Sequence, residues 1–430
     1  MEKKFRIISI LFIVGCIIFY GGRFGYFYMK YNKKSSNSSS KEVLAITIQK
    51  KGIVSSKDGL YNDNGELVFK GEKVDNYLIY SNILWRIVRV NNDNSIVLVT
   101  DSKLTDLAYS SDTDSDFTKS YIMNWLNKNG QNTGILESKL NKKEEYLTYN
   151  TICLDTVDNL NNITCHKKDN SKYVSILGIG DYLNSKVDDS YMNNTDSIWL
   201  YNSKKDNKAW YITNGNLSND KKQSMHGIKA VITLKNTIGS VGGSGTKEDP
   251  YLIEKEENNL FNSYVKLGND LYTVYDIENE KIKLVSTKLV NDVTSRSINY
   301  YNKEFNPNNR NSIAYYLNNT YYNKLTYKNS LVDCDYYIGN YDNLTKYDYK
   351  NIYTKKVTTK VGLLSISDIN LNNELNNYFY LNKVDNKIYS FNNSLNVSYS
   401  TNKIRPTVCI DKNTKLKGNG TKINPFELEV

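Results

Sequence analysis

The segment GGSGTKEDPYL at residues 242–252 returns near the C-terminus as KGNGTKINPFE at residues 417–427. The two prolines of this motif, Pro250 and Pro425, lie 425 − 250 = 175 positions apart. That separation is far longer than the period of a solenoid repeat, in which each unit needs its neighbours to bury a core. The duplication therefore predicts two modules that each bury a core of their own.

The duplication can be followed backwards from this closing segment. Further pairs of segments match in the same order, with offsets from 404 − 228 = 176 to 316 − 125 = 191. A small drift with preserved order is what loop insertions between fixed elements produce. The matching pairs are residues 84–88 with 271–275, 125–127 with 316–318, 174–177 with 361–364, 198–200 with 379–381, and 228–232 with 404–408.

The N-terminus predicts a membrane anchor at residues 1–31. An almost unbroken apolar run at residues 7–20 follows three basic residues, which is the layout of a signal anchor or a signal peptide. The helix must continue to the aromatic residues at 24–28, because a bilayer span needs about 20 residues. We therefore predict a single-pass protein of the cell membrane, with the bulk of the chain extracytoplasmic.

A lipoprotein is the alternative, because residues 13–16 resemble a bacterial lipobox in which Cys16 would be lipidated. The apolar residues directly after Cys16 favour the anchor. The polar Ser/Asn/Lys composition that follows predicts a flexible linker over residues 32–50. The remaining chain divides into module one, residues 51–255, and module two, residues 256–430.

The charge of the chain bears on its partners. The formal net charge is +10, and the lysines are interleaved with Asp and Asn rather than gathered in one basic stripe. Together with the expected membrane anchor, this pattern argues against a nucleic-acid partner and favours electrostatic affinity for anionic cell-wall polymers. The excess of Asn, Lys, Ile and Tyr carries little further information.

Short hairpins dominate the predicted secondary structure. Residues 77–90 and 96–99 are apolar and β-branched and flank a polar turn at residues 91–94, which is typical of two paired strands. Residues 120–126 show helical periodicity instead, with apolar side chains on one face, and residues 312–317 repeat it. These patterns predict a mixed α+β fold, rich in short strands and hairpins and without long crossover helices.

Several of these motifs support a family resemblance. Module one carries LWRI at residues 84–87 and closes on GSGTKEDPY at residues 243–251, while module two carries Arg405-Pro406 and GNGT at residues 418–421. Together they resemble an uncharacterised family of extracytoplasmic modules of low-GC Gram-positive and related bacteria, over most of residues 52–430. The resemblance implies no established activity. The order of its motifs is also similar to C-type-lectin-like and formylglycine-enzyme-like folds.

Aromatic side chains are the candidates for ligand binding. The chain has 37 Tyr and four Trp, and exposed Tyr and Trp side chains stack on sugar rings. Trp85 and Trp125 lie at strand and helix positions that predict burial. Module two keeps Arg-Pro where module one has Lys229 followed by Ala, so only one module could use an arginine there. The predicted binding residues are Trp199, Trp210, Tyr211, Tyr380 and Arg405.

The cysteines offer one clear candidate disulfide. Cys153 and Cys165 lie 165 − 153 = 12 positions apart in a polar loop. A bridge closing a loop of this size stabilises the fold by about 2 to 3 kcal/mol in the chain-entropy model. Cys409 sits in an apolar strand and is expected to be a buried thiol, with a bridge to Cys334 as the alternative.

No set of residues predicts catalysis. The chain has only two histidines, His166 and His226. Cys165 is adjacent to His166, and adjacent side chains of a strand point apart, so they cannot form a catalytic pair. Ser224 near His226 is too generic a pattern to indicate a site. We therefore predict that the protein is not an enzyme and has no catalytic residue.

Metal and cofactor sites are not expected either. Asp112, Asp114 and Asp116 alternate as in the opening of an EF-hand loop, but Phe117 stands where the sharp-turn glycine belongs and Met123 where the bidentate glutamate belongs. An acidic loop that caps the following helix explains the pattern better. The glycine-rich closing segments lack the spacing of a phosphate-binding loop and predict tight turns.

Taken together, the sequence predicts a membrane-anchored bacterial surface protein with two tandem modules. Its expected function is non-catalytic binding to a cell-wall or host glycan or to another surface protein. Two alternatives remain: a hydrolase or transferase acting on envelope polymers, and a structural spacer or assembly protein. Exposed aromatic residues on a concave surface would favour binding, whereas a pocket with a strongly perturbed carboxylate would favour an enzyme.

Overall fold

The structure is a computed structural model, and strands make up 38% of it against 14% for helices. The expected α+β class is therefore wrong, and the fold is mostly β-sheet. In the described part of the chain, the helices are short elements of three to six residues each. The strands pair with one another to form the sheets that make up most of the fold. The structure describes residues 42–110, 116–128, 134–193, 196–253, 260–294, 305–337, 356–364, 368, 379–381, 388–390 and 403–429.

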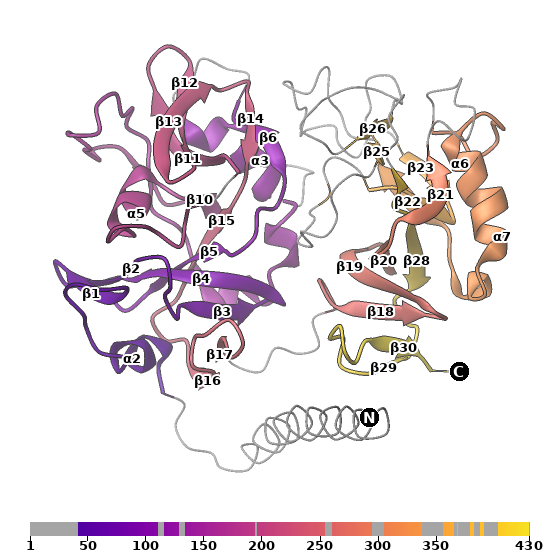
Figure 1. Cartoon of the computed structure of the whole chain (residues 1–430), viewed down its shortest axis with the longest axis horizontal. Helices are drawn as coiled ribbons and strands as arrows, with labels where there is room; N and C mark the ends of the chain where they lie inside the picture. Colours follow the sequence, from indigo (N-terminus) through magenta and orange to yellow (C-terminus); the bar gives the residue numbers. More distant parts are fainter. Residues whose placement is uncertain are drawn as a thin grey trace, which may run out of the picture. The chain divides into compact units, whose positions relative to one another are not determined.

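The first half of the chain is built on a ten-stranded sheet (Figure 1). Its strands are β1 (Gly59–Asp63), β2 (Glu66–Lys70), β3 (Tyr77–Tyr80), β4 (Ile83–Val90), β5 (Ile96–Thr100), β7 (Leu147–Thr148), β10 (Ser175–Ile176), β15 (Ala230–Leu234), β16 (Ser240–Gly242) and β17 (Tyr251–Ile253). The main path of this first sheet runs β10-β15-β5-β4-β3-β17-β16. Only the β17–β3 pair on this path is parallel.

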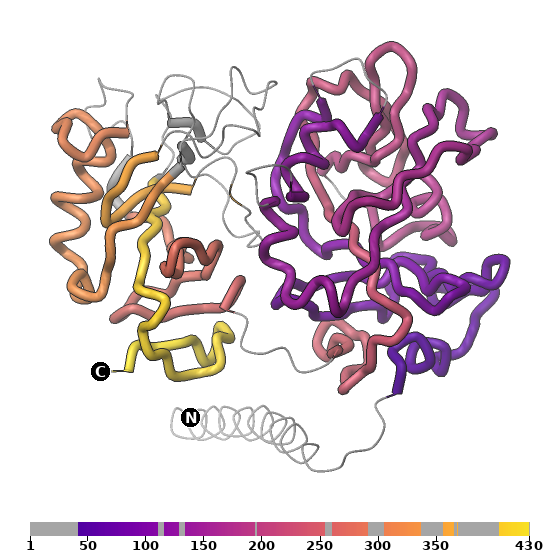
Figure 2. Tube along the Cα trace, turned by 180° about the vertical axis from the view of Figure 1, so that it is seen from behind, coloured from indigo at the N-terminus to yellow at the C-terminus, as the bar shows by residue number. Residues whose placement is uncertain are grey.

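The second half contains a seven-stranded sheet with the same plan. Its strands are β18 (Tyr264–Leu267), β19 (Asp270–Glu278), β20 (Lys281–Ser286), β24 (Val361–Gly362), β28 (Thr407–Asp411), β29 (Leu416–Lys417) and β30 (Phe426–Leu428). The order β24-β28-β20-β19-β18-β30-β29 repeats the main path of the first sheet strand for strand. Its parallel pair, β18 with β30, is also the equivalent one, and Figure 2 shows the yellow C-terminal segment beside it. The module boundaries stay a prediction.

A five-stranded sheet and four two-stranded ones complete the described strands. The five-stranded sheet runs β13-β12-β11-β14-β6. Its strands are β6 (Asp106–Ala108), β11 (Ile198–Lys204), β12 (Lys208–Thr213), β13 (Asn216–Lys221) and β14 (Met225–Gly227). The small sheets pair β8 (Ile152–Cys153) with β9 (Lys168–Asp169), β21 (Val290–Thr294) with β27 (Lys403–Ile404), β22 (Cys334–Tyr337) with β23 (Lys356–Thr359), and β25 (Phe379–Leu381) with β26 (Ile388–Ser390).

The described helices are short and connect the strands. They are α2 (Leu44–Gln49), η1 (Phe117–Lys119), α3 (Tyr121–Leu126), η2 (Glu137–Lys139), α4 (Lys143–Tyr146), α5 (Ile179–Asn184), α6 (Ile313–Tyr315), η3 (Tyr316–Tyr321), α7 (Tyr322–Lys324) and η4 (Lys328–Ser330). Equivalent serines begin α3 and α6. Ser120 Oγ accepts from Met123 N at 3.1 Å, and Ser312 Oγ accepts from Ala314 N at 3.2 Å.

The repeated closing motif is a turn that only glycine permits. Gly243 and Gly418 have φ of 86° and 116°. A Cβ at Gly243 would lie 2.0 Å from the carbonyl oxygen of Pro250, and one at Gly418 would lie 2.3 Å from that of Pro425. Any other residue would be strained and would clash with the backbone at either position.

The second glycine of each motif hydrogen-bonds to the first residue of a strand inside the sheet. The carbonyl of Gly245 accepts from Tyr77 N, the first residue of β3, at 2.8 Å. The carbonyl of Gly420 accepts from Tyr264 N, the first residue of β18, at 2.7 Å. The motif therefore closes each half by placing β17 beside β3 and β30 beside β18, which is the structural reason for its repetition.

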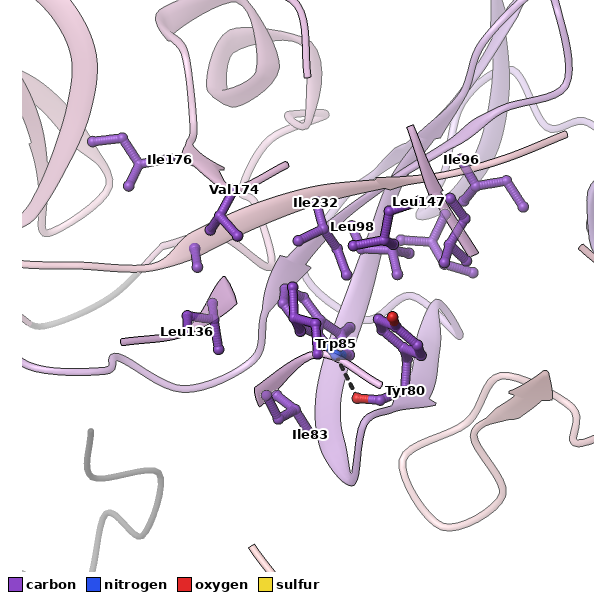
Figure 3. Close-up of a cluster of buried hydrophobic side chains, with 14 of the residues drawn as sticks. Tyr80, Ile83, Trp85, Ile96, Leu98, Leu136, Leu147, Val174, Ile176 and Ile232 are labelled. Atoms are coloured by element: carbon purple, nitrogen blue, oxygen red, sulfur yellow. Dashed lines mark hydrogen bonds between the residues drawn. The ribbon is translucent and has the colours of Figure 1, made fainter. Parts of the chain in front are cut away.

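The first sheet is buried on both faces. Along β5, Ile96 and Leu98 belong to one hydrophobic cluster, and Val97 and Val99 belong to another, as the alternation of a strand requires. Figure 3 shows the first cluster around Trp85, which is fully buried and donates from Nε1 to the carbonyl oxygen of Tyr80 at 3.0 Å. The second cluster joins the first sheet to helix α5 and to strands β11 and β12.

A separate hydrophobic cluster forms the core of the second half. It surrounds Tyr272, which replaces Trp85 in the duplication and is also fully buried. The hydroxyl of Tyr272 forms a 2.5 Å hydrogen bond with the hydroxyl of Tyr327. The second half thus buries a pair of tyrosines where the first half buries an indole. In both halves the polar group of the buried ring has a hydrogen-bond partner.

One asparagine performs the same task in both halves. Asn127 Nδ2 donates to Val174 O at 2.8 Å, and its Oδ1 accepts from Val174 N at 3.0 Å. Asn318 makes the same pair of bonds with Val361, both at 2.9 Å. Each asparagine therefore ties a helical segment to the start of a sheet strand, Asn127 to the residue before β10 and Asn318 to the first residue of β24.

The predicted membrane anchor at residues 1–31, with Cys16, lies outside the described residues. Within the described ranges, no helix is long and apolar enough to cross a membrane. The longest run of helical elements there, residues 313–324, is shorter than the about 20 residues that a span requires. This finding does not support the prediction of a single-pass membrane protein with an extracytoplasmic bulk, which is therefore withdrawn.

The predicted flexible linker, residues 32–50, also differs from the structure where the structure describes it. Helix α2 occupies part of this range, and its Leu44, Ala45 and Ile48 are fully buried in the first hydrophobic cluster. Leu44 N donates to the carbonyl oxygen of Ile238 at 2.8 Å. The prediction extended the polar composition of residues 32–41 over the short apolar segment that follows, which forms helix α2.

Candidate functional site

A polar cavity of about 550 Å3 lies between the first sheet, helix α5 and strand β11. Its lining residues in the sheet come from β2, β4, β5, β7, β10, β15 and the turn between β4 and β5, and others come from the loop at residues 149–151. The volume lies in the range of about 300 to 1,000 Å3 that is typical of small-molecule sites. This cavity is the candidate functional site.

Arg89 is the cation of the cavity. The β4–β5 register shifts between Ile87 and Arg89, so a bulge redirects the side chain of Arg89. Its Nη1 donates to Asp181, its Nε donates to Asn91 Oδ1 at 2.8 Å, and Glu66 Oε2 lies 3.8 Å from Nε. Burial lowers the pKa of Arg89, but Asp181 and Glu66 raise it above its usual value, so the guanidinium stays charged.

Helix α5 positions Asp181. The carboxylate lies in the first turn of this helix, where Asp181 Oδ2 accepts from Gly178 N at 3.1 Å. A carboxylate in the first turn of a helix also interacts favourably with the helix dipole. Asp181 is therefore held from two sides, by the helix N-terminus and by Arg89, and its side chain is only 14% exposed.

The turn between β4 and β5 contributes a set of polar side chains that hold one another. Asn91 Nδ2 donates to Ser95 Oγ at 2.8 Å. Asp93 Oδ1 accepts from Ser95 N at 2.9 Å and from Ser95 Oγ at 2.6 Å. These hydrogen bonds lower the pKa of Asp93 below its usual value, so that the carboxylate is ionised at neutral pH.

Asn150 fixes the opposite wall. Its Nδ2 donates to the carbonyl oxygens of Tyr173 and Val231 at 2.8 and 3.1 Å. Its Oδ1 accepts from Thr233 Oγ1 at 2.7 Å. Because each of these groups is satisfied in the folded chain, the polar wall is preorganised and does not need to rearrange around a ligand.

Two tyrosines give the cavity an aromatic surface. Tyr149 is 49% exposed, and its ring centroid lies 4.6 Å from that of Tyr173, with 43° between the planes. Tyr201 reaches the cavity from β11, and burial raises the pKa of its phenol, which therefore stays protonated at neutral pH. An exposed ring beside fixed polar groups is suited to a ligand that has both apolar and hydroxyl faces.

The charges that line the cavity are mainly negative. Three carboxylates, of Glu66, Asp93 and Asp181, and one guanidinium, of Arg89, leave a formal charge of 1 − 3 = −2. This charge is opposite in sign to the +10 of the whole chain. The cavity is therefore expected to repel anions even though the chain as a whole attracts them.

The predicted tryptophans do not form a binding surface. Trp199 is fully buried and donates from Nε1 to Leu107 O at 2.9 Å. Trp210 is 6% exposed and donates from Nε1 to Val157 O at 2.7 Å. Both indoles pack in hydrophobic clusters, and neither lines the cavity. At these positions both faces of β11 and β12 are covered, with Trp199 in one hydrophobic cluster and Trp210 in the other, so these large rings are core residues.

The other predicted binding residues also lie away from the cavity or beyond description. Tyr211 is half-buried and stacks on His226, with ring centroids 4.1 Å apart. Arg405 is 2% exposed, and its Nη1 donates to Ser286 O at 2.5 Å. Tyr380 belongs to β25, but its side chain lies outside the described part of the structure. Neither Tyr211 nor Arg405 lines the cavity.

Sequence reasoning missed the residues that line the cavity, although one signal was present. Arg89 is a charged residue within a strand whose other residues are largely buried, and an unexplained charge at such a position indicates a polar partner across the fold. That partner, Asp181, is 181 − 89 = 92 positions away. No spacing rule connects positions so far apart.

The cysteines pair in both halves of the chain. The structure joins Cys153 to Cys165, the predicted candidate pair. It also joins Cys334 to Cys409, where a buried thiol was expected. The expectation for Cys409 is corrected because its partner begins β22, and the chain just before β22 pairs with β28 through the bridge between Val332 and Cys409. Sequence alone did not place these two strands side by side.

The acidic run lies only partly within the described residues. Asp112 and Asp114 fall outside them, while Asp116 caps η1, its Oδ1 accepting from Thr118 N at 3.0 Å. In the described ranges, no group of three or more His, Cys, Asp or Glu side chains is placed to hold a metal ion.

The sequence matches no protein-family model and no curated protein, and the fold matches no solved structure. The resemblance to extracytoplasmic modules and to the C-type-lectin-like fold therefore stays a prediction. The same fold can have many functions, so a function must be argued from a site. The functional proposal is therefore based on the cavity.

Proposed function

We propose that the chain binds a glycan and that the polar cavity holds one or two of its sugar residues. The observation that carries the proposal is the meeting of fixed polar side chains with one exposed aromatic ring, Tyr149, in a cavity of about 550 Å3. The proposal concerns binding, because the lining side chains are held in hydrogen bonds and ion pairs suited to recognition.

Sugar hydroxyls match the groups that line the cavity. Each hydroxyl both donates and accepts, so it pairs with carboxylate and amide oxygens such as those of Asp93 and Asn91 and with the guanidinium of Arg89. The C–H face of a sugar ring packs on an aromatic side chain, which Tyr149 supplies. A purely apolar ligand would displace water from these polar groups and offer no hydrogen bond in return.

The charge of the cavity narrows the class of glycan. A formal charge of −2 from the lining residues favours neutral sugars or amino sugars and disfavours uronic acids and other anionic sugars. Anionic polymers would still be attracted by the net charge of +10, but only weakly and in a way that salt removes. Specific binding and charge attraction can thus be separated by ionic strength.

A protein partner or a pure spacer role fits the cavity less well. A stable protein interface covers about 800 Å2 on each partner and is centred on buried aromatic anchors. The cavity is instead concave and polar, and Tyr149 is the one large ring exposed in its lining. A spacer needs no preorganised polar cavity at all.

Calorimetric titration of the purified chain with oligosaccharides tests the proposal. The probes are a neutral glucose oligomer, an amino-sugar oligomer and a uronic acid oligomer, each at low and at physiological salt. We expect saturable, salt-resistant binding of a neutral or amino-sugar oligomer and only salt-sensitive binding of the uronic acid oligomer. If every interaction disappears at physiological salt, the proposal is wrong.

The first variant for this experiment is Tyr149→Ala, because it removes the aromatic surface without touching the ion pairs of the cavity. We expect a loss of affinity of about tenfold, which corresponds to about 1.4 kcal/mol. The matched control is Tyr61→Ala, since Tyr61 is on β1 and does not line the cavity. Equal effects of the two variants would place the binding site elsewhere.

A further inference from the structure

A hydrogen-bonded Ser–His–Asp series lies on the five-stranded sheet. His226 Nδ1 lies 2.5 Å from Ser197 Oγ, and His226 Nε2 lies 3.2 Å from Asp220 Oδ2. Ser224, the serine close to His226 in sequence, hydrogen-bonds to Asp220 instead. None of these residues lines the polar cavity, so the series is a separate feature of the fold.

The hydrogen bonds define which ring nitrogen carries the proton. An ionised carboxylate only accepts, so His226 Nε2 must donate to Asp220. Nδ1 is then left as the acceptor for the hydroxyl proton of Ser197. Burial lowers the pKa of His226 below its usual value, and Asp220 only partly offsets this effect. The imidazole is therefore neutral at neutral pH and can act as a base towards Ser197.

Aromatic packing fixes the imidazole ring. It stacks on Tyr211 at 4.1 Å, with 20° between the planes, and meets the edge of Trp199 at 4.3 Å and 79°. His226 is 8% exposed, whereas Ser197 is half-buried at the entry to β11. The base is shielded and held in one orientation, while Ser197 is partly accessible, which is the division of roles that nucleophilic catalysis needs.

Two ion pairs hold the residue that precedes the serine. Lys103 Nζ is 3.1 Å from a carboxylate oxygen of Asp196, the residue before Ser197, and 3.0 Å from one of Asp106. Gly227 makes this approach possible, since a Cβ there would lie 2.5 Å from Lys103 Cδ and 3.0 Å from the carbonyl oxygen of Ser197. Because Lys103 is paired with both carboxylates, its charge is balanced, and the ion pairs hold the chain at Asp196 and Ser197 in place.

We propose that Ser197 is a nucleophile activated by His226, and that this site hydrolyses carboxylic esters. The Oγ–carbon bond forms as the hydroxyl proton passes to Nδ1, and the ester C–O bond breaks as that proton passes to the leaving alcohol. Water then attacks the acyl–serine, gives its proton to Nδ1, and releases the carboxylic acid and the serine hydroxyl. Asp220 is a positioning residue that holds the tautomer and stabilises the imidazolium.

A fluorophosphonate probe on the full chain tests the nucleophile. In this reaction the Ser197 Oγ–phosphorus bond forms, fluoride leaves, and the hydroxyl proton passes to His226. We expect the label on the peptide that contains Ser197 and no label in Ser197→Ala. The control Ser218→Ala, at a half-buried serine on β13 of the same sheet, should be labelled as the wild type is. An unlabelled wild type, or labelling that persists in Ser197→Ala, overturns the proposal.

The labelling rate tests the base and its orientation. His226→Gln should lower the rate by about 100-fold or more. Asp220→Asn should also lower it, because the ring would no longer be held with its proton on Nε2 and Nδ1 free to accept from Ser197. The rate should rise with pH through the pKa of His226, which lies below 6.5. The charged groups around this ring are Asp220, Asp106 and, through its ion pair with Asp106, Lys103. Ser224→Ala should change the rate only a few-fold.

The fold of each variant is checked by near-ultraviolet circular dichroism, because His226 packs against Trp199. A folded His226→Gln variant that is labelled as fast as the wild type would show that Ser197 reacts without the base, and would overturn the proposal. The test is independent of glycan binding. If Ser197 is labelled but no sugar binds, this inference stands and the proposed function is wrong. If sugar binds but Ser197 is not labelled, the proposed function stands and this inference is wrong.

Discussion

Lys229 is a buried ammonium for which the described residues provide no ion pair. It is 9% exposed and takes the place in the first half that Arg405 takes in the second. Burial lowers its pKa to about 8, Asp101 partly offsets this shift, and Arg86 adds to it. The charged form is therefore unfavourable in the folded chain, which makes Lys229 a source of pH-dependent stability.

The sign of this dependence follows from proton binding. The unfolded chain keeps Lys229 protonated up to its ordinary value of 10.5, whereas the folded chain releases the proton near pH 8. Between these values the unfolded state binds more protons, so the free energy of unfolding should rise with pH, by up to about 3 kcal/mol. The stabilisation is lost as the pH falls back through about 8.

Urea unfolding of Lys229→Met between pH 7 and 10 checks this prediction. We expect the variant to be more stable than the wild type at pH 7 and to lack the rise above pH 8. The control is Lys57→Met, because Lys57 is exposed. An identical pH slope in the wild type and in Lys229→Met would show that another group causes the dependence.

At the scale of elements, the glycines of the closing motif have a specific consequence. Gly243→Ala and Gly418→Ala should each lower the free energy of unfolding by at least about 2 kcal/mol, since each adds a Cβ at positive φ and against a carbonyl oxygen. Gly180→Ala is the control, because Gly180 lies in α5 and a Cβ there meets nothing within 4 Å. That variant should be neutral or slightly stabilising. Equal effects at all three sites would contradict the assignment.

The two disulfides should differ in their response to reductant. Cys334 and Cys409 are fully buried, whereas Cys165 is exposed and Cys153 half-buried. Mild dithiothreitol followed by alkylation and mass spectrometry should modify the Cys153–Cys165 pair first, and the Cys334–Cys409 pair only under unfolding conditions. Simultaneous reduction of both bridges under native conditions would contradict this order.

Loss of the buried bridge should also cost more stability. The Cys334–Cys409 bridge spans 75 positions and the Cys153–Cys165 bridge 12. The chain-entropy model assigns about 4 kcal/mol to the longer loop and about 3 kcal/mol to the shorter one. Paired Cys→Ala variants, compared by urea unfolding, measure this difference.

At the scale of the whole molecule, two hydrophobic clusters with the same sheet order suggest two units of local stability. The asparagine ties at Asn127 and Asn318 offer a matched test of this. Replacing either by Asp removes the donor to a buried carbonyl oxygen and should cost about 2 to 3 kcal/mol. Asn161→Asp, at an exposed site, is the control.

Hydrogen exchange measured by mass spectrometry shows where that stability is lost. Asn127→Asp should accelerate exchange in peptides of the first half, and Asn318→Asp in peptides of the second half. Acceleration across both halves by either single variant would show instead that the described residues open as one cooperative unit.

The fold could be predicted only in part, and the reasons are local. The hairpin of β4 and β5 and the helix that begins after Ser120 are visible in sequence, because two apolar, β-branched runs flank a polar turn and a serine caps the helix. The α+β class was wrong because single helical turns show the same periodicity as longer helices. Helix α2 was missed because one short apolar segment follows a long polar one.

What the sequence determined by itself was the repetition of a closing motif at matched places, because turns of this kind depend on local backbone geometry, which glycine reveals directly. Tertiary structure alone decided the polar cavity and the series of Ser197, His226 and Asp220. Arg89 and Asp181 meet across 92 positions, and Ser197 meets His226 across 29. Residues this far apart are brought together by strand order and register, and spacing along the chain does not encode these contacts.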